Sequence, residues 1–187
     1  EFALNHAAPL ETDHLQTWLD YWSHVHVTGI DLGLERVIPV AEKLGVINPD
    51  AKVFTVAGTN GKGSTTTTIA AILNAQGYHV GLYQSPHIYR FNERVKLAGQ
   101  EVDYQTLIDA FVLVDHARRE CQLTLSFFEA TTLAAFVIFS IEISTCSFVC
   151  VAISEYRIRQ SSFGTAEETT GLTKIPSASR CWVSIRA

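Results

Sequence analysis

The sequence predicts an α/β fold, built on a P-loop-type parallel sheet with flanking helices. A short β-branched apolar run, Val53–Ala57, leads through a glycine-rich stretch into a helical apolar pattern that ends at Gly77, and a second apolar run follows at Val80–Tyr83. A strand–loop–helix–strand unit of about thirty residues is the usual size for a parallel crossover. The chain has 187 residues, 47% of them hydrophobic and 18% charged, which suits a globular core.

Two helices are expected before the first strand. The first follows Thr12, a candidate N-cap, and carries apolar residues at helical spacing: Leu15, Trp18, Leu19 and Trp22. The second spans residues 34–44, and Gly45 and then Pro49 stop it. Both patterns predict amphipathic helices that bury one face.

The elements after the second strand are a hairpin and two helices. The segment "ERVKLAGQEVD" alternates around Gly99 as a hairpin does, and Asp103 can cap a helix that carries Leu107 and Phe111. Ser126 and Glu129 have the spacing of a capping box, which predicts the start of an apolar helix over Phe127–Phe139.

The stretch between the two predicted strands has the composition of a phosphate-binding loop. It departs from the generic pattern, because Val56 stands where a glycine is usual and Gly63 separates Lys62 from the first hydroxyl. A strand end followed by a helix start nevertheless offers free N–H groups and a partial positive charge to an anion. The alternative is a glycine-rich turn capped by Ser64. We expect a nucleotide site in which Lys62 reaches the terminal phosphates, formed by Gly58, Thr59, Asn60, Gly61, Lys62, Gly63 and Ser64.

Charge and composition weigh against several classes of partner. The net charge is −5 and no run of Lys or Arg is present, which argues against a nucleic-acid partner. The longest apolar run, Leu133–Phe139, is too short to span a bilayer, and the first thirty residues lack the pattern of a signal peptide. The four cysteines have no metal-type spacing. A reduced, cytoplasmic, monomeric protein with small-molecule partners is expected.

The chain changes character near residue 140. Residues 1–140 hold 9 basic and 15 acidic side chains and every histidine. Residues 141–187 hold 5 basic and 4 acidic side chains, and the regular spacing of apolar residues fades there. Residues 1–140, which include the expected nucleotide site, are predicted to form an organised domain. Residues 141–187 are expected to be a tail of different origin, frameshifted or disordered.

Four segments together resemble one family. The loop "TVAGTNGKGST" is similar to the phosphate loop of Mur-type ligases, in the form that occurs in folylpolyglutamate and dihydrofolate synthases. The segments "GIDLGLERV", "YQSPHIYRFNERV" and "LSFFEATTLAAF" resemble the same enzymes in the same order, over residues 15–139. The resemblance implies the amino-terminal part of a Mur-ligase central ATPase domain.

The resemblance also implies a reaction and its site residues. Such ligases use ATP and Mg²⁺ to convert a carboxylate of dihydropteroate or a reduced folate to an acyl phosphate, which the amine of L-glutamate then displaces. Ser85 matches a magnesium ligand, although a serine before Pro86 is also common in plain loops. The expected pterin-binding residues are Gly29, Ile30, Asp31, Leu32, Ser126, Phe127, Phe128 and Glu129. Their alternative roles are helix capping for Asp31, Ser126 and Glu129, and core packing for the two phenylalanines.

The resemblance weakens after the helix over Phe127–Phe139. The family continues with a strand that ends in a magnesium-binding glutamate and a glycine-rich turn, and a ligand histidine follows. Here "SFVCVAISEYRIRQ" reaches Glu155 without that turn, and no histidine follows His116. Three hypotheses therefore stand: a folate-type glutamate ligase, a non-catalytic nucleotide-binding module, and a cell-wall Mur-type ligase. The motifs "DLGLERV" and "SPHIYRFNERV" speak against the third.

Overall fold

The structure is a computed structural model that describes residues 7–26, 34–47, 51–58, 60–142, 146–153, 173–174 and 181–186. Its contacts divide the chain into two units, which are described separately. The helical unit comprises Glu1–Pro49 and Asp103–Ile141, and the sheet unit comprises Asp50–Val102 and Glu142–Ala187.

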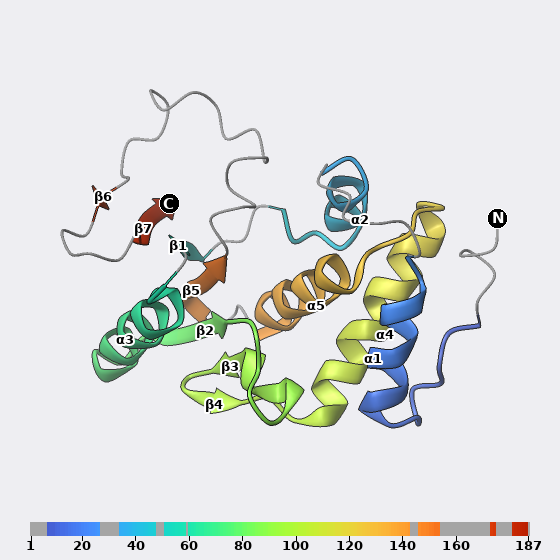
Figure 1. The fold of residues 1–187 in the computed structure, drawn as a ribbon, viewed down its shortest axis with the longest axis horizontal. Coiled ribbons are helices and arrows are strands. Elements are labelled where there is room, and N and C mark those ends of the chain that lie inside the picture. The colour runs from blue at the N-terminus through green and yellow to red at the C-terminus, as the bar shows by residue number, and fades with distance from the viewer. Residues whose placement is uncertain are drawn as a thin grey trace. The chain divides into compact units, whose positions relative to one another are not determined.

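The sheet unit is built on a seven-stranded sheet in the order β4-β3-β2-β5-β1-β7-β6 (Figure 1). Its centre is parallel, because β5 pairs in parallel with β1 on one side and with β2 on the other. The outer strands β7 and β3 pair antiparallel to β1 and β2. The strands are β1 (Lys52–Gly58), β2 (His79–Tyr83), β3 (Val95–Leu97), β4 (Gln100–Glu101), β5 (Cys146–Ile153), β6 (Thr173–Lys174) and β7 (Cys181–Arg186).

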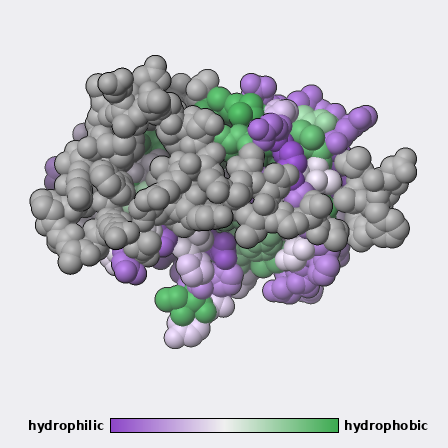
Figure 2. Space-filling model, turned by 45° about the horizontal axis from the view of Figure 1, so that its top comes forward, coloured by the Kyte–Doolittle hydropathy of each residue, from purple (hydrophilic) through white to green (hydrophobic). Residues whose placement is uncertain are grey.

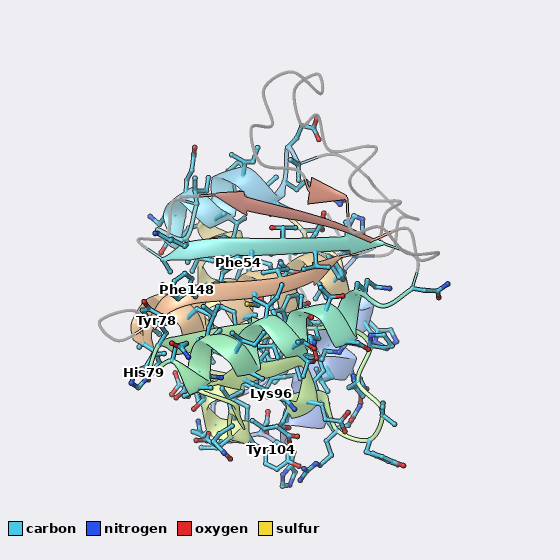
Figure 3. All side chains as sticks on the ribbon, turned by 90° about the vertical axis from the view of Figure 1, so that its left-hand side faces the viewer. Phe54, Tyr78, His79, Lys96, Tyr104 and Phe148 are labelled. Carbon is cyan, nitrogen blue, oxygen red and sulfur yellow. The ribbon has the colours of Figure 1, made fainter. Side chains whose placement is uncertain are left out.

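Helix α3 (Lys62–Ala75) runs across one face of this sheet (Figure 3). The core beneath it contains Ala70, Val80, Leu82 and Cys150, all at least 94% buried. At one end of the strands, the Phe148 ring lies 5.8 Å from that of Phe54 and 4.9 Å from that of Tyr78. Helix, strand and turn residues therefore share one apolar layer.

The β3–β4 hairpin confirms the turn expected around Gly99. Leu97 pairs with Gln100, so Ala98 and Gly99 form a two-residue turn. Both turn residues have positive φ, 48° at Ala98 and 83° at Gly99, as the tight turns that match the twist of a hairpin require. The short 3-10 helix η1 (Phe91–Arg94) leads into β3.

The helical unit contains α1 (Leu15–His24), α2 (Val37–Lys43), α4 (Tyr104–Glu120) and α5 (Phe127–Ile141). Trp18 and Trp22 of α1 pack against Phe111 of α4, with ring centroids 6.3 and 6.1 Å apart. All three side chains are essentially inaccessible to solvent. The face that the α1 sequence pattern predicted to be buried is thus the one that meets α4.

A charged cluster lies inside this helical core. Asp115 and Arg118 are 3% and 0% exposed, and Arg118 Nε donates to Asp115 Oδ1 at 2.7 Å. Tyr21 Oη donates to the same oxygen at 2.6 Å, and Arg119 Nε donates to Oδ2 at 2.5 Å. Each buried charge thus has an opposite partner and hydrogen bonds, which is the condition under which burial of an ion pair is tolerated.

The order and type of the expected elements are confirmed, and three boundaries differ. The cap of α1 is His14 rather than Thr12, helix α2 begins at Val37 rather than at Leu34, and α3 begins at Lys62, before its apolar pattern is visible. Asp103 caps α4 as expected, because its side chain accepts from Thr106 N at 2.8 Å.

The boundary expected near residue 140 stays a prediction. The described residues that follow it form β5, β6 and β7. In the part of the chain that the structure describes, no helix has the length and apolarity that crossing a membrane requires. On the face shown in Figure 2, hydrophilic residues cover most of the described surface and hydrophobic residues form smaller patches.

Candidate phosphate-binding site

The glycine-rich loop connects β1 to α3 at the carboxyl edge of the parallel strands. Ala57 at the end of β1 lies opposite Ile153 of β5, and Tyr83 at the end of β2 lies opposite Val151. The residues after β1 and β2 therefore emerge at the same edge, where open parallel sheets bind ligands. Gly58, Asn60, Gly61, Lys62, Gly63 and Ser64 lie there as predicted, and Thr59 lies outside the described residues.

Gly61 is the N-cap of α3 and has φ 77° and ψ −6°, in the left-handed region that favours glycine. A Cβ placed on it would meet no atom within 4 Å, so the space beside this residue is open. Among the described residues, no side chain caps this helix end, and its first turn has no acidic residue. The first N–H groups of α3 thus keep the capacity and the partial charge to bind an anion.

Hydroxyl groups of the next turn bond back to this helix start. Thr65 Oγ1 donates to Gly61 O at 2.8 Å, and Thr66 Oγ1 donates to the carbonyl oxygens of Lys62 and Gly63, both at 3.0 Å. Thr66 is fully buried. The carbonyls of a helix point away from its amino end, so these bonds leave the N–H groups at the open end of α3 free of side-chain acceptors from this turn.

The loop after β2 begins with Gln84 and Ser85. Gln84 Nε2 donates to Gly63 O at 2.8 Å and to Thr66 Oγ1 and Thr67 Oγ1 at 2.7 and 2.8 Å. Ser85 is partly buried and precedes Pro86 through a cis peptide bond. The structure therefore brings the residue before Ser85 into contact with the phosphate-loop helix.

The rest of this loop folds over the carboxylate of Glu93. That carboxylate accepts from the backbone N–H groups of Ile88, Tyr89 and Arg90, at 2.7, 2.9 and 2.7 Å. These hydrogen bonds lower the pKa of Glu93, and the bond from the Ile88 N–H has the largest effect. Ile88 and Tyr89 are 79% and 88% exposed. A backbone held by one side chain thus presents two apolar residues to solvent.

In the helical unit, Ser126 and Glu129 form the predicted capping box at the start of α5. Ser126 N donates to Glu129 Oε2 at 2.7 Å, and Glu129 N donates to Ser126 Oγ at 3.3 Å. Glu129 is 5% exposed and also pairs with Arg36 Nη2 at 3.1 Å. Phe127 and Phe128 are partly buried. The other predicted pterin-binding residues, 29–32, lie outside the described residues.

Arg36 also contacts His26, so its guanidinium connects a residue just after α1 to Glu129 of α5. Arg36 Nη1 donates to His26 Nε2 at 2.8 Å, and His26 Nδ1 lies 3.1 Å from Thr124 Oγ1. A guanidinium can only donate, so the imidazole of His26 is the acceptor in its contact with Arg36.

Sequence reasoning missed Gln84, Thr66 and Arg36. A polar residue directly after a buried strand, at the edge where the phosphate loop was expected, was an available signal for Gln84. Thr66 sits in a run of four threonines with no feature that distinguishes it, and the partner of Arg36 is 93 residues away in the chain. Among the described residues, no group of three or more His, Cys, Asp or Glu side chains could hold a metal ion.

A parallel β1–β5–β2 core with a glycine loop leading into α3 defines a P-loop-type α/β protein of the Mur-ligase kind. No family model matches the chain, but relatives and solved structures do. The chain is 47% identical to the dihydrofolate synthase/folylpolyglutamate synthase of Escherichia coli K12 over 131 residues, which cover 70% of this chain and 31% of that protein. The enzyme of the same name from Haemophilus influenzae is 41% identical over 68% of this chain and 29% of its own length.

Solved structures agree with these relatives. A structure of E. coli FolC in complex with DHPP and ADP superposes with a TM-score of 0.73 at 42% identity, over 78% of this chain and 34% of that one. The structure of the bifunctional enzyme of Yersinia pestis, complexed with AMPPNP and Mn, superposes with a TM-score of 0.73 at 41% identity. The match covers 79% of this chain and 35% of that one. The matched residues belong to the dihydrofolate synthase/folylpolyglutamate synthase family. The chain spans about a third of the length of these relatives.

Proposed function

We propose that this chain carries the phosphate-loop part of an ATP-dependent ligase that joins L-glutamate to dihydropteroate or a reduced folate. The observation that carries the proposal is the open, glycine-capped start of α3 at the carboxyl edge of the parallel strands. The relatives' names, and the ADP and AMPPNP in two of the solved structures, support a nucleotide as the anion.

The residues fit the β- and γ-phosphates of a nucleotide. The N–H groups at the start of α3 would bind phosphate oxygens, and Lys62 would offset the negative charge that shifts during phosphoryl transfer. Gly61 would allow close approach, because it adopts a backbone conformation that is strained for other residues. Positioning and charge neutralisation are the main demands of this chemistry.

Ser85 would supply one oxygen ligand to Mg²⁺, an ion that keeps several waters and takes further oxygens from phosphate. When bound, the ion supplies charge neutralisation between the phosphates. In the helical unit, Ser126, Phe127, Phe128 and Glu129, with residues 29–32, would hold the pterin-bearing substrate. The two phenylalanines are suited to stack on a flat ring.

Binding tests the first part of the proposal. We expect calorimetric titration of the chain with MgADP to show one saturable site per chain, and inorganic phosphate at the same concentration to compete weakly. A chain with folded secondary structure that takes up neither ADP nor ATP would contradict the nucleotide assignment.

The second candidate is a nucleotide-binding module without turnover. It is favoured by the sequence after Ile141, which departs from the family and leaves Ser85 as the one matched magnesium ligand. Release of phosphate with ATP, magnesium, dihydropteroate and glutamate distinguishes the two. We expect none from this chain, and recovery when a relative's sequence continues in frame from residue 140. Glutamate-dependent release by the 187-residue chain would reject the module. The monomeric state and cytoplasmic location stay predictions.

A further inference from the structure

The side-chain amide of Gln84 makes the main side-chain contact between the end of β2 and the start of α3. Its Nε2 atom lies within 2.8 Å of three acceptors: Gly63 O, Thr66 Oγ1 and Thr67 Oγ1. All of these residues belong to the sheet unit. Gln84 itself is partly buried, so solvent competes only in part for these bonds.

The acceptors decide which way the amide points. Gly63 O is a carbonyl and can only accept, so the group facing it must be the NH₂ of Gln84. The hydroxyl of buried Thr66 donates to the carbonyls of Lys62 and Gly63, which leaves its lone pairs toward Gln84. The reversed amide would place two carbonyl oxygens against each other. The orientation therefore follows from the neighbours and is not a free choice.

Holding Gly63 O has a direct effect on the N–H group of Ser64. The two belong to one planar trans peptide unit, in which C=O and N–H point in opposite directions. This peptide lies in the first turn of α3, where carbonyls point along the helix and N–H groups point toward its open start. The bond from Gln84 to Gly63 O helps to hold the peptide, and with it the Ser64 N–H, in that orientation. That N–H is one of those without a helical acceptor.

We propose that Gln84 is a positioning residue that sets the orientation of the Gly63–Ser64 peptide for an incoming phosphate group. It also ties this peptide to Ser85, its neighbour in the chain. The proposal rests on the nucleotide assignment of the loop. Gln84 touches neither phosphate nor metal and acts through the peptide that it holds.

The test uses Gln84→Met, which keeps the length and packing of the side chain but removes its donors. We expect a loss of about tenfold in MgADP affinity, which corresponds to about 1.4 kcal/mol and is within the usual worth of one or two hydrogen bonds. We also expect faster amide exchange at Thr66 and Thr67, whose helical acceptors are Lys62 and Gly63. The control is Gln76→Met, at the exposed carboxyl end of α3. This variant should change neither the MgADP affinity nor the amide exchange of Thr66 and Thr67.

A second variant gives a signature that loss of packing would not produce. Gln84→Glu puts a carboxylate oxygen against Gly63 O, a carbonyl that cannot donate, so the MgADP affinity should fall further than in Gln84→Met at neutral pH. As the pH falls and the new carboxyl becomes protonated, the MgADP affinity of Gln84→Glu should recover toward that of the wild type measured at the same pH. An affinity that follows the wild type at every pH would overturn the proposal.

The outcomes separate this proposal from the one on which it rests. If the wild type does not bind ADP, the nucleotide assignment fails, and amide exchange in Gln84→Met still shows whether Gln84 holds the peptide. Wild-type affinity in Gln84→Met would overturn the positioning role, whatever the exchange rates show.

Discussion

At the scale of the residue, Lys62 carries the strongest functional prediction. It is the first residue of α3, where a flexible ammonium can reach terminal phosphates. A ligand at a hundred times its dissociation constant stabilises the fold by about 2.7 kcal/mol, and Lys62→Ala should lose most of that stabilisation by ATP in thermal unfolding. Lys52→Ala, at the other end of β1, is the matched control. Undiminished stabilisation of Lys62→Ala by ATP would reject the role.

A second residue prediction concerns the thiol of Cys150. Cys150 is fully buried in β5, and burial raises the pKa of its thiol to about 12. Because the thiolate is the reactive form, iodoacetamide at pH 8.5 should modify the partly buried Cys121 well before Cys150. Peptide mapping by mass spectrometry measures both rates. Equal rates in the folded chain would contradict the burial of β5.

The same shift makes the sheet sensitive to alkaline pH. Burial raises the folded pKa of the Cys150 thiol above its ordinary value of 9.0, so the thiol contributes stability in full below pH 9. That contribution is lost as the pH rises toward 12. Cys150→Ala removes this dependence, and urea unfolding between pH 8 and 11 should then show a smaller loss for the variant than for the wild type.

At the scale of the element, the cap of α4 gives a prediction of stability. Asp103→Ala removes the acceptor of Thr106 N and should cost about 1 kcal/mol in urea unfolding, whereas Asp103→Asn keeps an acceptor and should cost less. The bond from Thr106 lowers the pKa of Asp103 below 3.8. The charged cap therefore contributes in full above that pH, and its contribution is lost as the pH falls through the folded pKa. If the free energies of unfolding of the wild type and Asp103→Ala differ by the same amount at pH 2 and at pH 7, this account is contradicted.

Elements also show what the sequence could and could not foretell. Strands β1 and β2, the Gly99 turn and the Asp103 cap have local chemical causes and were predicted. Strand β5, which lies between β1 and β2, falls in the segment that was expected to be a tail of different origin. The helix start was expected in the glycine-rich stretch, but its first residue was not fixed, because four threonines hide the apolar period. At least three of these threonines donate to carbonyl groups one turn earlier. The contacts of Arg36 join segments distant in the chain, and no local pattern encodes them. For Gln84, the only local signal was its position directly after a buried strand.

At the scale of the whole molecule, the sheet depends on a strand that comes late in the chain. Val151 of β5 lies opposite Thr55 of β1 and Tyr83 of β2. Proline in a central strand removes a ladder hydrogen bond, so Val151→Pro should prevent the sheet unit from folding cooperatively. Circular dichroism and urea unfolding measure this.

The matched control is proline at Tyr104, the exposed first residue of α4 after an extended Asp103, where proline is tolerated. A native-like unfolding curve for Val151→Pro would contradict the central position of β5. The composition of the chain did not indicate this dependence. The place of β5 between β1 and β2 is a property of the contacts between strands and not of the residue content.

The place of β5 between β1 and β2 also has a consequence for synthesis. A ribosome that has released Tyr83 must still add the residues up to Cys146 before the shared partner of both strands exists. At about 5–20 residues per second this takes roughly 3 to 13 s. During that interval the nascent β1 and β2 each present an unpaired edge, which is the form most prone to intermolecular pairing and to capture by chaperones. Slow codons between Tyr83 and Cys146 should therefore lower the soluble yield, and the same codons placed before Lys52, where neither strand has yet been made, should not.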